Sequence, residues 1–254
     1  MIMLKYGLIK KEINEYMKTS KGFILIAIFT FFALTSPATA KFMNEILAAV
    51  AGDIQVSFPD PTLQDSWIQV FKNMNSICLI VYVIVMSASV SQEKSKGSIL
   101  LVLTKGVSRF QFLLSKFIVG VFVFTVLLLL STIVSAWYTN LLFSGFVFEG
   151  LFMSIFLFWL MGVFFTALAI FISVIGKTPT NSALLAFFAY AVLQIINISS
   201  DLALYSPAGA STIVNGIIGQ TINLGEIWLP ITSAILFSMI LFYLSQLIFK
   251  KQEI

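Results

Sequence analysis

The chain has 254 residues, of which 59% are hydrophobic and 10% are charged, and its mean hydropathy is +1.01. Soluble domains carry about 25% charged residues, so this composition excludes a soluble domain and predicts an integral membrane protein. We interpret the pI of about 9.1 as basic segments that face an anionic membrane leaflet, and not as nucleic-acid binding.

Residues 1–21 have the periodicity of an amphipathic helix. Apolar side chains recur at spacings of three and four residues, and polar side chains occupy the other faces. The apolar positions are Ile2, Tyr6, Ile9, Ile13 and Tyr16. The pattern predicts a helix that lies in the inner membrane interface before the first span.

The same region also has the features of a secretory signal. Basic residues precede an apolar run at 23–34, and Ala38-Thr39-Ala40 matches a small-residue cleavage site. The helical periodicity of residues 1–21 favours a retained structural element. Mature protein that begins at Lys41 would contradict this interpretation.

Six apolar stretches are long enough to span a bilayer. Each is close to the ~20 residues that a helix with a rise of 1.5 Å needs to cross ~30 Å of hydrocarbon. Lipid offers no hydrogen bonds, so each stretch is expected to be helical. The stretches are residues 22–40, 74–91, 117–138, 151–175, 181–200 and 228–249. The predicted fold is an all-α membrane protein with one transmembrane domain over residues 1–254.

The connection at residues 41–73 has a pattern of its own. Two short amphipathic segments are separated by Gly52 and by Pro59-Asp60-Pro61. Glycine and proline at these positions are typical of a turn. The pattern predicts two surface helices joined by that turn.

Charge predicts the orientation of the spans. With the N-terminus inside, the cytoplasmic segments hold 13 of the 15 basic residues, and only Lys41 and Lys72 fall outside. Cytoplasmic loops of membrane proteins carry an excess of lysine and arginine. We therefore expect both termini in the cytoplasm, with Asp60, Glu149 and Glu226 on the outer side.

The predicted spans contain no His, Asp, Glu, Lys or Arg. Such a residue costs about 2.5–3.5 kcal/mol on insertion scales and usually marks a proton relay, an ion path or a catalytic site. Its absence argues against a proton-coupled pump and an intramembrane enzyme, so we expect neither catalytic nor metal-binding residues. Cys78 is the only cysteine, which excludes an internal disulfide.

The sequence contains two other notable polar features. Gly176-Lys177-Thr178 copies the end of a phosphate-binding loop but lacks the glycine five residues earlier. Gln194 and Asn197 lie three residues apart on one helix face, where they can meet a substrate or a second protomer. Helix–helix packing is the alternative role for this amide pair.

A charge-dense loop lies between the second and third predicted spans. A Glu/Lys run is followed by Gly97, a short apolar helix, the tripeptide Val107-Ser108-Arg109 and Lys116. This pattern resembles the first cytoplasmic loop of ABC-2 type transporter permeases, which reads Glu-basic-x-x-Gly-(Ser/Thr)-apolar run-Pro-(Val/Ile)-Ser-Arg. The usual proline is Gly106 here, which keeps a helix stop but makes it less rigid.

The resemblance implies a fold and partners. Two permease protomers, identical or homologous, pair around a path, and two cytoplasmic ABC ATPase subunits bind their loops. ATP and Mg²⁺ belong to the ATPase, and this chain holds no cofactor. The resemblance also implies that residues 201–227 form a re-entrant outer hairpin, since irregular backbone at that depth needs protein or water beside it.

The resemblance also implies that residues 97–103 form a coupling helix. Its apolar side chains would insert into an ATPase groove, and the neighbouring charges would set orientation at the rim. The expected coupling residues are Glu93, Lys94, Lys96, Gly97, Ser98, Ile99, Leu100, Val102 and Arg109. A basic cluster that binds lipid head groups is the alternative.

The sequence therefore predicts the permease subunit of an ATP-driven ABC-2 exporter in a bacterial cytoplasmic membrane. It would move a hydrophobic or amphipathic substrate outward and would have no enzymatic activity of its own. The alternatives are a membrane immunity or sensor protein that binds a peptide or lipid ligand without transport, and an intramembrane enzyme. Co-purification of a soluble ATPase distinguishes the exporter from a stand-alone binder.

Overall fold

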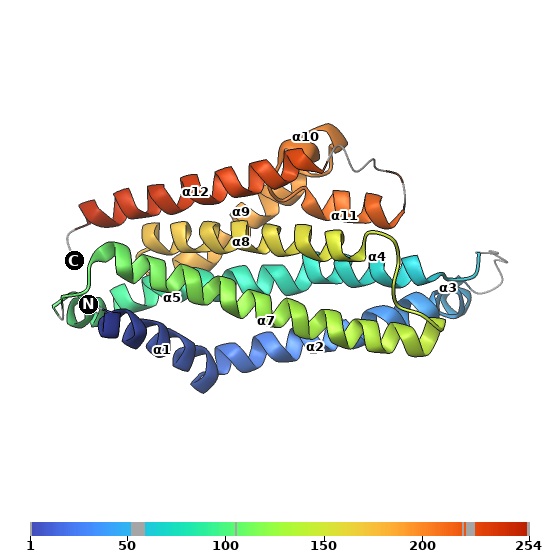
Figure 1. Ribbon diagram of the computed structural model, residues 1–254, viewed down its shortest axis with the longest axis horizontal. Helices are drawn as coiled ribbons and strands as arrows, with labels where there is room; N and C mark the ends of the chain where they lie inside the picture. The colour runs from blue at the N-terminus through green and yellow to red at the C-terminus, as the bar shows by residue number, and fades with distance from the viewer. Residues whose placement is uncertain (1, 52–58, 105, 220, 222–226, 253–254) are drawn as a thin grey trace.

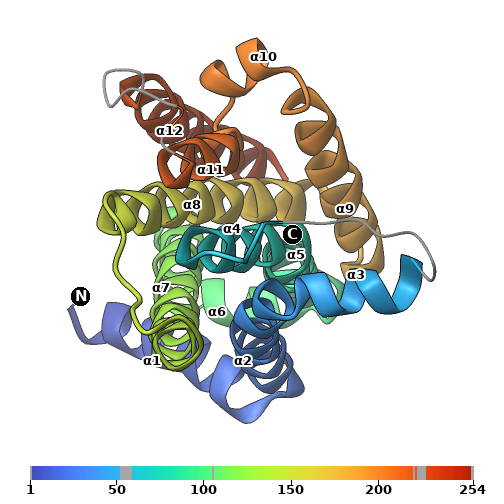
Figure 2. The ribbon, with the colours of Figure 1, turned by 90° about the vertical axis from the view of Figure 1, so that its right-hand side faces the viewer.

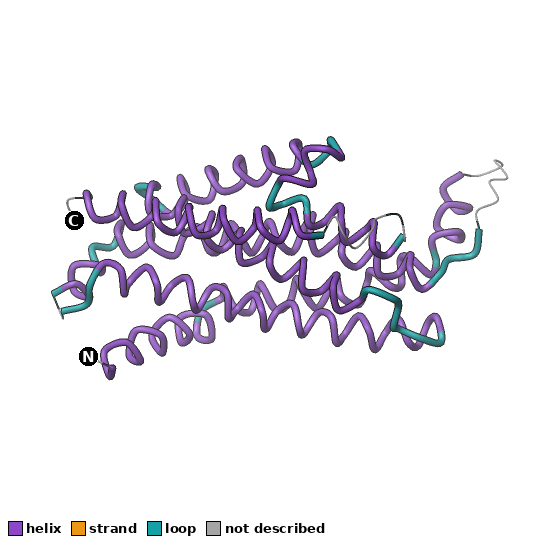
Figure 3. The backbone as a smooth tube through the Cα atoms, turned by 45° about the horizontal axis from the view of Figure 1, so that its top comes forward, coloured by secondary structure: helices purple, strands orange, loops and turns teal. Residues whose placement is uncertain are grey.

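The computed structural model describes residues 2–51, 59–104, 106–219, 221 and 227–252. This part of the chain consists of helices and loops, without strands (Figure 3). The long helices run along one axis and form an elongated bundle (Figure 1). The elements are α1 Ile2–Lys18, α2 Ser20–Lys41, α3 Met43–Ala51, α4 Leu63–Asn73, the π-helix η1 Met74–Leu79, α5 Ile80–Ser95, α6 Ser98–Leu103, α7 Arg109–Phe143, α8 Leu151–Ile175, α9 Pro179–Ile196, α10 Ser200–Tyr205, α11 Ala210–Ile218 and α12 Trp228–Lys251.

Six helices among the described residues are long and apolar enough to cross a membrane. They correspond one to one to the six predicted spans. The predicted bounds of α8 agree with the structure, whereas α7 extends beyond 117–138 at both ends. The six are α2, the continuous α4–η1–α5, α7, α8, α9 and α12.

The prediction that the second helix within residues 41–73 lies on the surface is wrong. That segment is α4, which continues through η1 into α5 as one helical rod of 33 residues. Its apolar face packs inside the bundle, where Trp67 and Phe71 are buried and Trp67 donates a hydrogen bond to the Phe146 carbonyl oxygen at 2.8 Å. The apolar face that the amphipathic pattern of α4 indicates therefore packs against protein. The first predicted surface helix corresponds to α3.

Helix α8 forms the centre of the bundle. It contacts α5, α7, α9, α11 and α12, and Figure 2 shows it between α11 and α12 on one side and α4, α5 and α7 on the other. A helix without a polar face is expected to be buried, and most residues of α8 are buried, although Phe152 and Phe156 near its start are exposed. Gly162 lets the Phe124 ring approach the α8 backbone, because a Cβ atom there would lie 1.9 Å from the ring.

The two ends of the bundle differ in content. Both ends of the chain, α6 and the α8–α9 junction lie at one end, here called the terminal end (Figure 1). The opposite end holds α3 and the α7–α8 connection. Helices α10 and α11 lie in the segment expected to be re-entrant, and α11 packs on α8 and α4. The depth of this segment in the membrane, like the interfacial position of α1, stays a prediction.

Candidate functional site

Helix α6 is held between two sharp turns at the terminal end. Gly97 has φ +67° and Gly106 has φ +79°, a region that favours glycine. Ser108 then starts α7 with a capping box, in which its hydroxyl accepts from the Gln111 N–H. Proline fixes φ near −65°, so the turn at Gly106 has a conformation that the usual family proline could not adopt.

The apolar residues of α6 face in different directions. Ile99 is fully buried in the bundle, whereas Leu100 is 46% exposed and Leu101 is 69% exposed. Ile99 therefore cannot enter a partner's groove in this structure, and the expectation for it is corrected. Leu101, which was not among the expected coupling residues, is the most exposed apolar side chain of α6.

A pocket of about 680 Å³ lies between α6 and α1. Apolar side chains from both helices and from the following loop line it, together with charged residues. Its lining includes Leu8, Lys11, Glu15, Lys96, Leu101 and Val107. A partner helix that contacts Leu101 would therefore lie beside α1 as well.

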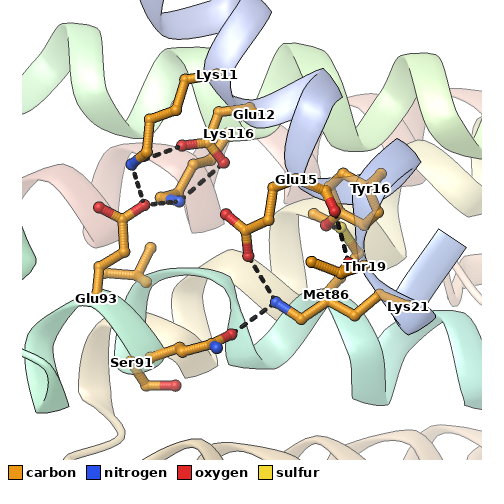
Figure 4. A network of polar contacts seen from close by, with 12 residues as sticks. Lys11, Glu12, Glu15, Tyr16, Thr19, Lys21, Met86, Ser91, Glu93 and Lys116 are labelled. Carbon is orange, nitrogen blue, oxygen red and sulfur yellow. Dashed lines mark hydrogen bonds and ion pairs between the residues drawn. The ribbon is translucent and has the colours of Figure 1, made fainter.

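A buried charge cluster, here called the triad, consists of Glu12, Glu93 and Lys116 (Figure 4), and Glu93 also lines this pocket. Lys116 Nζ lies 2.9 Å from Glu12 Oε2 and 2.8 Å from Glu93 Oε1. The exposed fraction of the side chain is 1% for Lys116, 3% for Glu12 and 9% for Glu93. Each comes from a different helix: Glu12 from α1, Glu93 from α5 and Lys116 from α7. The triad therefore joins α1 to both helices that flank α6.

A fourth charge balances the triad. Lys11 Nζ donates to Glu93 Oε1 at 2.8 Å and lies 3.7 Å from Glu12 Oε1. Buried charges are tolerated only when paired. Burial raises the pKa of the Glu12 carboxyl above its ordinary value, an effect that the nearby Lys116 opposes.

Two further contacts lie beside the triad, one made by Lys21 at the start of α2 and one made by Tyr16 of α1. Lys21 Nζ donates to Glu15 Oε1 at 2.7 Å and to the Gln92 side-chain oxygen at 2.6 Å. The Tyr16 hydroxyl lies 2.7 Å from the Met86 sulfur (Figure 4). Carboxylate oxygens of Glu12, Glu15 and Glu93 lie within 4.8 Å of one another. Each of these carboxylates pairs with a lysine.

Lys94 and Arg109 fasten the same loop to the ends of other helices. Lys94 Nζ donates to the Val174 carbonyl oxygen at 2.7 Å. Arg109 Nη1 donates to the carbonyl oxygens of Phe249, Lys250 and Gln252 at 2.6, 2.9 and 2.9 Å. The last carbonyls of a helix lack intrahelical partners and carry partial negative charge. These two cations therefore cap α8 and α12 from within the chain.

A polar pocket of about 230 Å³ lies toward the opposite end, between η1, α9 and α11. The side-chain amides of Asn75 and Gln194 exchange hydrogen bonds at 3.3 and 3.4 Å, and the Tyr190 hydroxyl donates to the Asn75 carbonyl oxygen. Both polar atoms of the Asn197 side chain are buried without a partner among the described residues. Asn215 and Lys72 complete the polar lining. A π-helix such as η1 is frequent at functional sites.

A family model for ABC-2 family transporter proteins matches residues 6–254. The chain belongs to the ABC-2 transporter family. A search among curated proteins returned no match. As an ABC-2 permease with six helices that can span a membrane, the chain is a multi-pass transport component of a family that associates with ABC ATPase subunits.

In this ABC-2 permease, the expected coupling residues divide into two groups. Lys96 and Leu100 are exposed, and their role stays a prediction. Glu93, Lys94 and Arg109 are not free rim charges, because they form the internal contacts described above. Gly97 forms the turn before α6. Ser98 donates to the Glu93 carbonyl oxygen at 3.4 Å, and Val102 is partly buried against the core.

Sequence reasoning missed the triad. Glu93 and Lys116 lie just outside the predicted spans 74–91 and 117–138, so the span pattern does not mark either as a buried charge. One signal was present: Glu12 lies four residues after Leu8 and four before Tyr16, on one helix face. All three of these residues are buried.

Proposed function

We propose that this ABC-2 permease is the transmembrane subunit of an ATP-driven exporter that moves a hydrophobic or amphipathic substrate outward. The observation that carries the proposal is the exposure of Leu100 and Leu101 on α6, beside the 680 Å³ pocket. Two exposed leucines on a short helix between two spans suit a helix-in-groove contact. The groove would belong to a cytoplasmic ABC ATPase, and two copies would serve a pair of permease protomers.

The terminal end faces the cytoplasm in this proposal. Exposed Lys10, Lys96, Lys177 and Lys250 lie at that end, in agreement with the excess of basic residues in cytoplasmic loops. The expected location is a bacterial cytoplasmic membrane. Of the acidic residues expected outside, Asp60 and Glu149 are described and exposed, and Glu226 lies outside the described residues.

Labelling of single cysteines tests this orientation. In a Cys78→Ala background, a membrane-impermeant thiol reagent should label Asp60→Cys in whole cells and should label Lys96→Cys only after permeabilisation. Labelling of position 96 but not position 60 in whole cells would overturn the orientation.

Force from the ATPase would pass through α6 into the two helices that flank it. The rod α4–η1–α5 has 33 residues and α7 has 35, so each spans about 50 Å at 1.5 Å per residue. ATP and Mg²⁺ would remain on the ATPase. A displacement of α6 would therefore move the adjacent ends of α5 and α7, and both of these helical segments reach the opposite end of the bundle.

The polar pocket at the opposite end is the proposed contact for substrate or for the second protomer. Gln194 already exchanges hydrogen bonds with Asn75, whereas the Asn197 amide is buried without a partner among the described residues. An unsatisfied buried amide costs roughly 1–3 kcal/mol. A group that hydrogen-bonds to Asn197 would remove that cost, which supports a contact there.

Co-purification with the cognate ATPase tests the proposal. Leu100→Asp and Leu101→Asp each put a charge into an apolar groove, so ATPase retention should fall by one or more orders of magnitude. Lys96→Ala is the matched control on the same surface and should change mainly the salt dependence of binding. Membrane insertion should be normal for all three variants.

Two results would contradict the exporter function. One is that the Leu100→Asp and Leu101→Asp variants both bind and stimulate the ATPase as the parent does. The other is that the parent binds no ATPase, which would favour a membrane protein that binds a peptide or lipid without transport.

A further inference from the structure

The triad occupies a position between the proposed docking surface and the N-terminal helix. Glu93 lies in the last turn of α5, and Lys116 lies in the second turn of α7. Helix α6 is the segment between those two helices. Glu12 lies on α1, whose other polar contacts to α5 run through Lys11 and Tyr16. Lys21 of α2 also bridges Glu15 of α1 to Gln92 of α5. Lys116 therefore bonds to the root of the α6 loop and to α1.

Stability alone does not explain the buried charges of the triad. Uncharged side chains of similar volume commonly stabilise a protein as well as a buried ion pair does, or better. Separating the partners, in contrast, leaves a charge buried without compensation. The consequence of the triad is therefore geometric, because α1, α5 and α7 cannot move apart here without exposing or orphaning a charge.

We propose that Lys116 is a positioning residue that clamps α1 to the coupling loop, so that α1 moves with α6 as one unit. This inference rests on the proposed docking of an ATPase at α6. Helix α1 leads through Thr19 directly into α2, which packs along α7 and α4. A displacement that enters at α6 would then reach three spans, α2, α4–η1–α5 and α7, instead of the two that flank the loop.

Distances between spin labels test the clamp. Labels are placed at Lys10→Cys on α1, Ser95→Cys at the loop root and Glu149→Cys at the opposite end, all exposed positions. They are introduced in pairs in the Cys78→Ala background, with labelled chain diluted in unlabelled chain. The neutral variant carries Glu12→Gln, Glu93→Gln and Lys116→Met, so it leaves no buried charge in the triad. Lys11 loses its carboxylate partners in this variant, but its side chain is 43% exposed and remains hydrated.

Without the ATPase, the distance between positions 10 and 95 should be narrowly distributed in the parent and at least twice as broad in the neutral variant. The matched control, Glu15→Gln with Lys21→Met, removes a partly exposed pair that joins α1 to the start of α2 and should keep the narrow distribution. An equally narrow distribution in the neutral variant would overturn the clamp. Equal thermal unfolding midpoints would show that the neutral variant is folded.

With the ATPase bound and trapped by ATP and vanadate, the distance between positions 95 and 149 should shift in both proteins. The distance between positions 10 and 95 should stay constant in the parent and change in the neutral variant. A change in the parent equal to that in the neutral variant would overturn the inference. Failure of the parent to retain any ATPase would instead overturn the exporter function, and the measurement without ATPase would still decide on the clamp.

Discussion

The two polar regions of this permease, the triad at the terminal end and the amide pocket toward the opposite end, differ in charge and in how completely their groups are paired. At the terminal end, Lys116 and its two carboxylates are charged, buried and paired at 2.8–2.9 Å. Toward the opposite end, Asn75, Gln194 and Asn197 are neutral amides beside a pocket, and one of them is without a partner among the described residues. Breaking a buried ion pair costs roughly 3–5 kcal/mol, whereas a hydrogen bond between membrane helices is worth about 0.6–2 kcal/mol. The terminal end is thus suited to keep its geometry, and the opposite end to exchange partners.

The largest expected effect comes from Lys116→Met alone. This change leaves Glu12 and Glu93 buried without the cation between them, so the folded state should lose roughly 3–5 kcal/mol. The loss should appear as a lower thermal unfolding midpoint and a lower yield of folded protein. Adding Glu12→Gln and Glu93→Gln to the same chain should restore most of it. A single variant as stable as the parent would remove the contrast between the two regions.

Gln194→Leu should have a smaller effect at the opposite end. It removes the side-chain partner of the Asn75 amide, and the cost should be about 1–2 kcal/mol. Asn197→Leu, three residues further along at the C-terminal cap of α9, is the matched control. It should cost no stability, because the Asn197 amide has no partner among the described residues to lose. Urea or thermal unfolding of both variants measures the difference, and a larger loss for Asn197→Leu would contradict it.

The smallest expected effect is a pH-dependent gain from Glu12→Gln. Burial raises the pKa of Glu12 above its ordinary value of 4.5, so the folded protein takes up this proton at a higher pH than the unfolded chain. The ionised carboxyl therefore lowers stability at neutral pH, and this cost disappears as the pH falls through the raised pKa. Glu12→Gln should unfold at an equal or slightly higher temperature than the parent at pH 7.5, with the difference vanishing toward pH 4.

Glu93→Gln is the control for that measurement. Two lysines, Lys11 and Lys116, donate to the same Glu93 oxygen, so removing its charge should lower the unfolding temperature at pH 7.5. The two glutamates would then respond to the same substitution with opposite signs. If Glu12→Gln destabilises the protein as much as Glu93→Gln does, the carboxylates are equivalent and burial does not dominate at Glu12.

The sequence by itself determined the six helices that can span a membrane and the short helix between the second and third. Both are local properties: a run of about 20 apolar residues must be helical in lipid, and the glycines at 97 and 106 form the turns after α5 and after α6. The family pattern is local as well, since it lies within residues 91–116. None of these features depends on which helices become neighbours.

Tertiary structure alone decided which groups meet. The three members of the triad are separated by 104 and 23 positions in the sequence, so no periodicity places them together. The rotation of α6 about its axis, set by its packing on the bundle, buries Ile99 and exposes Leu101. Likewise, η1 joins the amphipathic α4 to α5 and turns an expected surface helix into part of a span. In each case, contacts between residues far apart in the sequence determine which face of a helix is buried, and the local sequence does not.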